Sequence, residues 1–407
     1  MKGSPNGWKQ NIAALAALNS INMQTFQFKT PGTIIFKAGS AANPDTYRSL
    51  GINGNVLLVS DPTLTKLGIA EKVRQAITEC GSSVILFDQV EPEPKVSSVR
   101  KLVEFASSKK VSHVVGLGGG SPMDVAKIAA LMIPSPQAVE SMYGVGNARG
   151  TRLPLVLIPT TAGTGSEGTP VAVVTGEDGE KSPIVGPQFI CDSVILDAEL
   201  TLGLPPGVTA ATGADAMVHA IEAYTSAVRK NPVSDRLSIQ ALQLLHGNIT
   251  RVVEHGEDLE ARGKMLLGSM MAGLAFANAS VGAVHALAYP LGTQFHLSHG
   301  ESNAVVLVPV MRYNLAVATS LYAEISREVL TGSDAQNDDD DAAQLIDELS
   351  QLIPALGLKD RLSQYGITAY DLNSLTEGCL KQDRLLSYNA RPMRREDIRS
   401  AFHSVLN

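Results

Sequence analysis

Four short apolar runs in the first half of the chain alternate with segments of helical residue choice, and this alternation limits the possible folds. The runs are Asn55 to Ser60, Val84 to Phe87, Ser112 to Leu117 and Leu155 to Ile158. Continuous apolar runs of this length are typical of strands that are buried on both faces of a parallel sheet. Because helices are expected between them, the pattern predicts βαβ units and a doubly wound, mostly parallel α/β sheet.

The residue pattern changes after Pro205-Pro206, where strand-like runs give way to Ala- and Leu-rich helical segments. We therefore expect an α/β domain over residues 23–206 and an all-helical domain over 207–407. Residues 1–22 are interpreted as a mobile extension or an artefact of the assigned start. Thr25 to Phe36 is expected to form a hairpin around Pro31-Gly32. The acidic run Asp338 to Asp341 is expected to lie in a solvated loop.

Composition excludes several classes of function. The chain has 407 residues, 44% of them hydrophobic, and its formal net charge is −7. Without a compensating basic block, this charge argues against binding to nucleic acid. The chain contains no run of eighteen apolar residues, so the sequence predicts no membrane span. The three cysteines are widely spaced, which favours a reducing compartment and hence the cytoplasm.

Two loops that follow predicted strands are candidates for ligand binding. The first, Gly118 to Lys127, places three glycines before a helix, where backbone amides and the helix dipole favour a phosphate. It could equally be a tight turn. The second, Pro159 to Glu167, is rich in hydroxyl groups and could equally be a surface turn. Asp61, after the first strand, could bind the adenosine ribose or cap the helix that begins at Pro62.

Four residues of the second half form a candidate metal site. Asp215 and His219 are four residues apart, which places them on one helix face with Cβ atoms roughly 6 Å apart. His285 and His299 would lie roughly 21 Å apart in an unbroken helix, so we expect Pro290 and Gly292 to break it. A lone histidine is usually a core or surface residue. One carboxylate and three imidazoles together suit Fe²⁺ or Zn²⁺.

These motifs together resemble the iron-containing (group III) alcohol dehydrogenase family, from about Phe26 to the end of the chain. The resemblance rests on the 118–124 and 159–167 segments, the Asp-x-x-x-His and His-(thirteen residues)-His spacings, and Asn389-Ala390-Arg391-Pro392. It implies that the metal, Fe²⁺ or else Zn²⁺ or Mn²⁺, is bound by Asp215, His219, His285 and His299. It also implies an NAD(H) site formed by Asp61, Gly119, Gly120, Ser121, Asp124, Thr160, Thr161, Thr164 and Lys181.

One position departs from the family pattern. Family members often carry a histidine where this chain has Tyr289, and a phenol is a far weaker base at neutral pH. The proton would then pass through Tyr289, His296, water or the cofactor ribose.

The resemblance implies a metal-dependent alcohol dehydrogenase or aldehyde reductase that transfers hydride between NAD(H) and a small alcohol or aldehyde. A homodimer or higher homo-oligomer is also implied. The sequence leaves the alcohol itself open. The alternatives are an enzyme like dehydroquinate synthase or glycerol dehydrogenase, with a related metal and NAD site, or a non-catalytic assembly protein that retains the fold.

Overall fold

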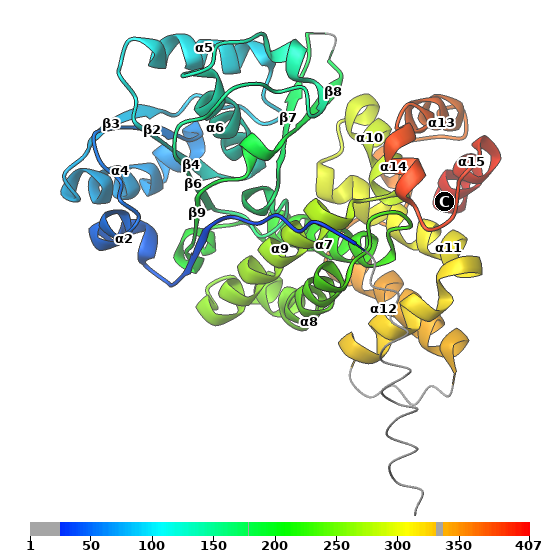
Figure 1. Cartoon of the computed structure of the whole chain (residues 1–407). Coiled ribbons are helices and arrows are strands. Elements are labelled where there is room, and N and C mark those ends of the chain that lie inside the picture. The colour runs from blue at the N-terminus through cyan, green and yellow to red at the C-terminus, as the bar shows by residue number, and fades with distance from the viewer. Residues whose placement is uncertain (1–24, 178, 331–336) are drawn as a thin grey trace, which may run out of the picture.

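The computed structural model describes residues 25–177, 179–330 and 337–407. The proposed N-terminal extension, residues 1–22, lies outside the described residues. Figure 1 shows an α/β part beside a part built from helices, with the long segment before β1 (Thr33–Phe36) running between them. The last short helix of the α/β part ends at Thr201, and helix α7 (Pro206–Thr225) begins the helical part.

A parallel six-stranded sheet forms the centre of the α/β part, as predicted, in the order β1-β9-β6-β4-β2-β3. After β1, its strands are β9 (Ser193–Leu196), β6 (Leu155–Pro159), β4 (His113–Gly118), β2 (Asn55–Val59) and β3 (Ser83–Phe87). Side chains alternate between two apolar layers. One layer packs under α2 (Pro44–Ser49) and α4 (Ile69–Glu79), and the other under α5 (Val96–Ser107) and α6 (Gly120–Met132). Both faces of the sheet are therefore covered, which explains the continuous apolar runs.

A second, smaller sheet follows the central one and was not predicted. It contains β5 (Gly144–Val145), β8 (Lys181–Val185) and β7 (Val171–Thr175), in that order. β7 and β8 are antiparallel, whereas β5 and β8 are parallel. Residues of all three strands line the cavity described below.

The hairpin predicted for Thr25 to Phe36 is wrong. Only Thr33–Phe36 is a strand, and it pairs in parallel with β9. The preceding segment is held by a helix instead, because the side-chain amide of Asn278 accepts a hydrogen bond from the Lys29 N–H and donates one to the Lys29 carbonyl (2.8 and 2.9 Å). This amide satisfies backbone groups that a second strand would otherwise have paired.

Helix α7 is the centre of the helical part and is buried along most of its length. It packs against α8 (Pro232–Glu254), α9 (Leu259–Ala279) and α11 (His299–Val329). The remaining helices are α10 (Ala283–Phe295), α12 (Asp338–Ala355), α13 (Leu372–Leu380), α14 (Asp383–Tyr388) and α15 (Arg395–Ser404). Among the described residues, α11 is the one single helix long and apolar enough to span a membrane by length and composition, and half of its apolar window is buried inside the protein. The pair α9 and α10 would pass the same test only if it were one span, and it is bent by 108°. Helix α11 packs on α7, α10, α12 and α15, as a core helix does.

The acidic run is not a loop, because Asp338 to Asp341 form the first turn of α12. The Asn337 side chain caps this turn by accepting a hydrogen bond from the Asp340 N–H. Arg327 near the end of α11 donates to Asp338 and Asp341 at 2.5 and 2.6 Å. Carboxylates are favoured in a first helical turn by the helix dipole, so this charge run marks a helix start. Residues 331–336, which precede this turn, lie outside the described residues.

A close backbone contact joins the two parts of the chain. The hydroxyl-rich loop after β6 packs on α9, where a Cβ atom added to Gly273 would lie 2.4 Å from the carbonyl oxygen of Gly165. Gly165 itself has a φ of +56°, which favours glycine. Two glycines on facing elements therefore set how closely the loop approaches the helical part.

We predict that Gly273→Ala destabilises the protein by about 1–3 kcal/mol, because the added methyl group would meet backbone atoms that have little room to move. Gly247→Ala in α8 is the matched control: nothing lies within 4 Å of its added Cβ. That control should stabilise the protein by about 0.5–1 kcal/mol through helix propensity. Denaturant unfolding of both variants measures the difference, and equal stability of Gly273→Ala and wild type would contradict the packing argument.

Candidate active site

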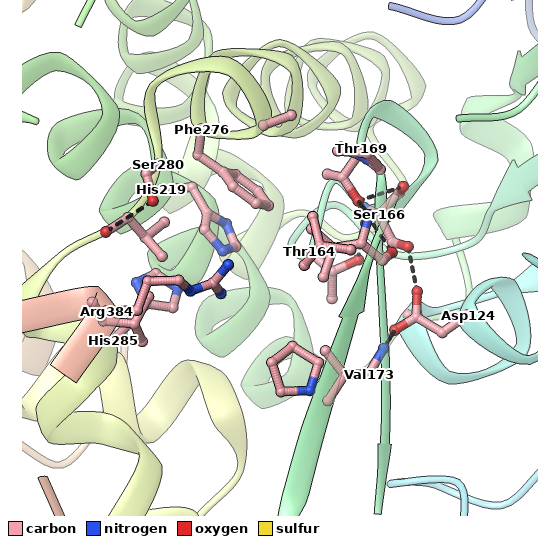
Figure 2. A pocket seen from close by; sticks show the side chains of 18 of the residues that line it. Asp124, Thr164, Ser166, Thr169, Val173, His219, Phe276, Ser280, His285 and Arg384 are labelled. Atoms are coloured by element: carbon pink, nitrogen blue, oxygen red, sulfur yellow. Dashed lines mark hydrogen bonds between the residues drawn. The ribbon is translucent and has the colours of Figure 1, made fainter. Parts of the chain in front are cut away.

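A cavity of 830 Å³ lies between the α/β part and the helices. One wall carries the start of α6, the loop that contains Thr164, and strands β7 and β8. The other wall carries residues of α7, α9, α10, α11 and α14. Figure 2 shows Asp124, Thr164, Ser166 and Thr169 on one side and His219, His285 and Arg384 on the other.

Three helices bring the four predicted metal-site residues together. Asp215 and His219 lie on α7, His285 on α10, and His299 is the first residue of α11. The Asp215 Oδ1 atom lies 3.9, 4.0 and 3.5 Å from the Nε2 atoms of His219, His285 and His299, respectively. One donor atom from each residue lies within 4.8 Å of the others. This four-residue cluster opens into the cavity through its three histidines.

The chain reverses between His285 and His299, but not where the sequence predicted. Pro290 and Gly292 lie inside α10, which continues to Phe295. The turn is made at His296, which takes a left-handed conformation (φ 59°) and donates its N–H to the Gly292 carbonyl. Ser298 then caps α11 with Glu301 in a reciprocal capping box. A proline inside a helix removes one hydrogen bond without necessarily ending the helix. Here the caps at His296 and Ser298 determine where α10 ends and α11 begins.

Glycine at position 300 allows α11 to begin against α7. A Cβ atom there would lie 2.1 Å from the carbonyl oxygen of Ala211. Only a residue without a side chain permits this approach, which places His299 beside the residues of α7.

The charges of the four-residue cluster suit a cation. Burial raises the pKa of Asp215, but the three imidazoles and a hydrogen bond from Asn303 outweigh it, so the pKa lies below its usual value. Burial lowers the pKa of His219 to about 3, although Asp215 opposes this effect. An ionised carboxylate beside a neutral imidazole is the protonation state that metal binding requires.

Two buried residues beside the four-residue cluster were missed by the sequence reasoning. Glu222 accepts hydrogen bonds from the Val284 N–H and from Nδ1 of His285, both at 2.6 Å. Asn303 donates its side-chain amide to Asp215 Oδ1 at 2.7 Å. Their spacing could have revealed them: Glu222 is seven residues after Asp215, and Asn303 four after His299, so each lies on the helix face of a predicted ligand.

Glu222 fixes the orientation of the His285 ring. Its carboxylate can only accept from Nδ1, which then carries the proton, and this leaves the Nε2 lone pair directed at the four-residue cluster. Such carboxylate–histidine pairs commonly support metal ligands.

The two predicted cofactor loops lie against each other. A Cβ atom on Gly120 would lie 3.1 Å from Thr164, and one on Gly119 would lie 3.6 Å from Thr161. Of the predicted cofactor residues, five line the cavity and four do not. The five are Gly120, Ser121, Asp124, Thr164 and Lys181; the four are Asp61, Gly119, Thr160 and Thr161.

Asp61 caps a helix and also faces the glycine loop. Its Oδ1 atom accepts hydrogen bonds from the N–H groups of Thr63 and Leu64, as in a standard N-cap. Its Oδ2 atom lies 3.4 Å from the position that a Cβ on Gly118 would take. One carboxylate oxygen is thus engaged in the cap while the other is directed at the start of the loop.

Asp124 supports the loops from inside the protein. One oxygen accepts from the Ser166 hydroxyl at 2.6 Å and the other from the Val173 N–H at 2.9 Å. Lys127, fully buried, donates to the Ser166 and Val171 carbonyls and to the Ser166 hydroxyl. Because the Asp124 oxygens are already engaged, its carboxylate holds the wall of the cavity in place.

The two candidate proton carriers have different positions. Tyr289 lines the cavity, and burial raises the pKa of its phenol, so the hydroxyl stays protonated. His296 is exposed at the end of α10 and is not among the cavity residues. Its position at the end of α10, in the left-handed conformation, gives His296 a structural role as the cap of that helix.

Comparison with known proteins places this arrangement among alcohol dehydrogenases. The family model of iron-containing alcohol dehydrogenases matches residues 31–198, and the model of the C-terminal part of that family matches 209–406. A long-chain-alcohol dehydrogenase of Geobacillus thermodenitrificans is 39% identical over 86% of this chain and 89% of its own length.

Solved structures of the same kind superpose over nearly the whole chain. A 1,3-propanediol oxidoreductase has a TM-score of 0.90 at 32% identity, over 94% of this chain and all of that one. A sulfoacetaldehyde reductase from Bifidobacterium kashiwanohense, in complex with NAD⁺, has a TM-score of 0.84 at 28% identity, over 94% of this chain and 99% of that one.

Proposed function

The chain belongs to the iron-containing alcohol dehydrogenase family, and from this premise we propose that it interconverts a small alcohol and its aldehyde or ketone with NAD(H). The observation that carries the proposal is the shared cavity: the four-residue cluster and the glycine loop line opposite walls of one space. A hydride donor and an acceptor must approach within contact distance, and one cavity holds both. Membership of this family favours an alcohol dehydrogenase over the alternative interpretations. These were an enzyme like dehydroquinate synthase or glycerol dehydrogenase, and a non-catalytic assembly protein.

The residues present fit a divalent ion. Asp215, His219, His285 and His299 offer one carboxylate and three imidazoles, a set that suits Fe²⁺ and also Zn²⁺ or Mn²⁺. A bound ion would supply Lewis-acid polarisation of the substrate oxygen, which lowers the pKa of an alcohol. Glu222 holds the His285 ring, and Asn303 holds the Asp215 carboxylate. Asp215, His219 and His285 are buried, so water has little access to the four-residue cluster from the protein interior.

The cofactor would lie along the opposite wall. The N–H groups at the start of α6, after Gly119, favour the pyrophosphate, and Gly120, Ser121 and Thr164 shape that end of the cavity. Thr160 and Thr161 support the loop from behind, and Asp61 would meet the adenosine ribose. Lys181 lies on β8 with its ammonium group paired to Glu93 at 2.6 Å, which fixes it at the cavity wall.

Proton transfer would involve Tyr289, water or the cofactor ribose. The protonated phenol can donate a hydrogen bond to an oxygen that gains charge during aldehyde reduction. The position of His296 outside the cavity lining favours Tyr289 over His296 in this proposal.

Removal of metal provides the direct test of the metal site. We expect chelation to abolish alcohol oxidation and Fe²⁺ to restore it, and His285→Ala to lose most bound metal in elemental analysis. Glu222→Gln should weaken metal binding by about tenfold to a hundredfold, because His285 loses its orienting partner. His403→Ala, on exposed α15, is the control and should keep the metal. Full activity of metal-free enzyme, or unchanged metal in His285→Ala, would refute the assignment.

Cofactor choice depends on Asp61. A 2′-phosphate would bring negative charge against its free oxygen, at a cost of several kcal/mol, which corresponds to a preference of about a hundredfold or more. We therefore expect wild type to favour NAD(H), and Asp61→Gly to raise kcat/KM for NADP(H) relative to NAD(H). Glycine is tolerated as an N-cap at a cost of about a few tenths of a kcal/mol, so the fold should survive. Asn43→Gly removes the cap of α2 and is the matched control. A wild-type preference for NADP(H) would overturn the ribose assignment.

We also propose that two copies pair through the β1 edge of the sheet. β1 is the last strand of the described sheet on that side, and Ile34 and Phe36 are 43% and 49% exposed. Exposed apolar side chains on a sheet edge favour pairing with another chain. Sedimentation velocity at micromolar concentration should give a dimer or larger assembly for wild type. Ile34→Lys should give monomer, whereas Val317→Lys on α11 should not. Monomeric wild type would contradict the proposal.

The cytoplasm remains a prediction for the location of the enzyme. It rests on the wide spacing of the three cysteines in the sequence, and cell fractionation tests it.

A further inference from the structure

Positive charge collects around the cavity. Five basic residues line it: Lys29, Lys181, Arg229, Lys230 and Arg384. Two of them are neutralised locally, since Lys181 pairs with Glu93 and Lys230 with Asp235, at 2.6 and 2.7 Å. Among the described residues, no carboxylate lies within ion-pair distance of the other three. The cavity is therefore cationic, although the whole chain carries a net charge of −7.

Arg384 is the one of these three that lies on the wall of the four-residue cluster. It is the second residue of α14, and its side chain reaches into the cavity from the side of His219 and His285, across the cavity from Asp124 and Ser166 (Figure 2). Both Arg384 and Tyr289, the candidate proton carrier, line this cavity, and the positive charge of Arg384 partly opposes the effect of burial on the pKa of the Tyr289 phenol. All three side chains are exposed, but Lys29 and Arg229 belong to other parts of the lining, before β1 and between α7 and α8.

The Arg384 side chain is exposed to the cavity, and no carboxylate of the described residues forms an ion pair with it, so its guanidinium is available to an incoming anion. Its planar fork of N–H donors matches a carboxylate or a sulfonate with two parallel hydrogen bonds. The dinucleotide pyrophosphate is expected at the opposite wall, on the start of α6, and so away from this guanidinium. The remaining molecule in the cavity is the substrate.

We propose, on the basis of the dehydrogenase function proposed above, that Arg384 binds an anionic group of the substrate. The substrate is then a short aldehyde, or the corresponding alcohol, that carries a carboxylate or sulfonate at the end remote from the reacting carbon. Its carbonyl lies at the four-residue cluster and its anionic group at Arg384, both on the helical wall. The reaction balances without another reactant: NADH gives hydride to the carbonyl carbon, a proton goes to the oxygen, and the anionic group is unchanged.

The test uses the full-length, Fe²⁺-loaded enzyme and aldehydes that differ in charge. These are 4-oxobutanoate, 2-oxoethanesulfonate and the neutral butanal, each reduced with NADH. Wild type should reduce at least one of the two anions with a kcat/KM about tenfold to a hundredfold above that for butanal, and added salt should narrow the gap. The better anion identifies the group that Arg384 holds.

Three variants separate the role of Arg384 from general effects. Arg384→Gln should lower kcat/KM for the preferred anion by about tenfold or more, mainly through KM, and change butanal less than about twofold. Arg384→Lys should keep part of the anion preference, because it retains charge without the fork. Arg399→Gln, on exposed α15 outside the cavity, removes the same charge and should behave as wild type.

Other outcomes overturn the proposal. The proposal of an anionic substrate is refuted if wild type has equal kcat/KM for butanal and the anions. It is also refuted if Arg384→Gln lowers kcat/KM equally for all three aldehydes. Weaker NADH binding in Arg384→Gln, measured by cofactor fluorescence, assigns the arginine to the cofactor instead. If no aldehyde is reduced, the dehydrogenase function fails. Arg384 is then tested by binding, through the fluorescence of bound NADH. In wild type, 4-hydroxybutanoate should change this fluorescence and butanol should not. In Arg384→Gln, neither compound should change it.

Discussion

The rest of the site depends on one buried carboxylate. Asp215 is 2% exposed, and a charge removed from water in this way is costly unless other groups compensate for it. The Asn303 amide compensates for part of this charge by its hydrogen bond, and a cation held jointly with the three imidazoles would compensate for the rest. These groups are carried by three helices, which must therefore dock in one particular arrangement, and that arrangement brings the histidines to the cavity wall. Cap residues, glycine contacts and the reversal after α10 all serve that docking.

Local sequence patterns predicted the parts of this structure that are set by local physics. Apolar runs predicted the central strands, because a strand covered on both faces has no polar side. The four-residue spacing placed Asp215 and His219 together, because helix geometry is regular. Glu222 and Asn303 lay within reach of the same reasoning. They were missed because a glutamate or asparagine in a helix is ordinarily a surface residue, and only the folded helix packing reveals that these are buried.

Other features depend on partners distant in the sequence, and local patterns misjudged them. The segment before β1 has strand-like residues, but Asn278, 249 positions after Lys29, binds its backbone. The acidic run starts a helix because Arg327 and the helix dipole favour its charge. The reversal between His285 and His299 follows from caps at His296 and Ser298 rather than from Pro290. The side chains that line the cavity, including Arg384 on the same wall as the histidines, also meet only in three dimensions.

All four residues of the metal-site cluster, and both residues that support them, come from positions 215–303 in the helical part. The groups that would hold the ion therefore belong to one part of the chain, whereas the cavity needs residues of both parts. Retaining an ion and performing the reaction would thus make different demands on the molecule. Cofactor exchange concerns mainly the opposite wall, so one loading of the ion would serve many catalytic cycles.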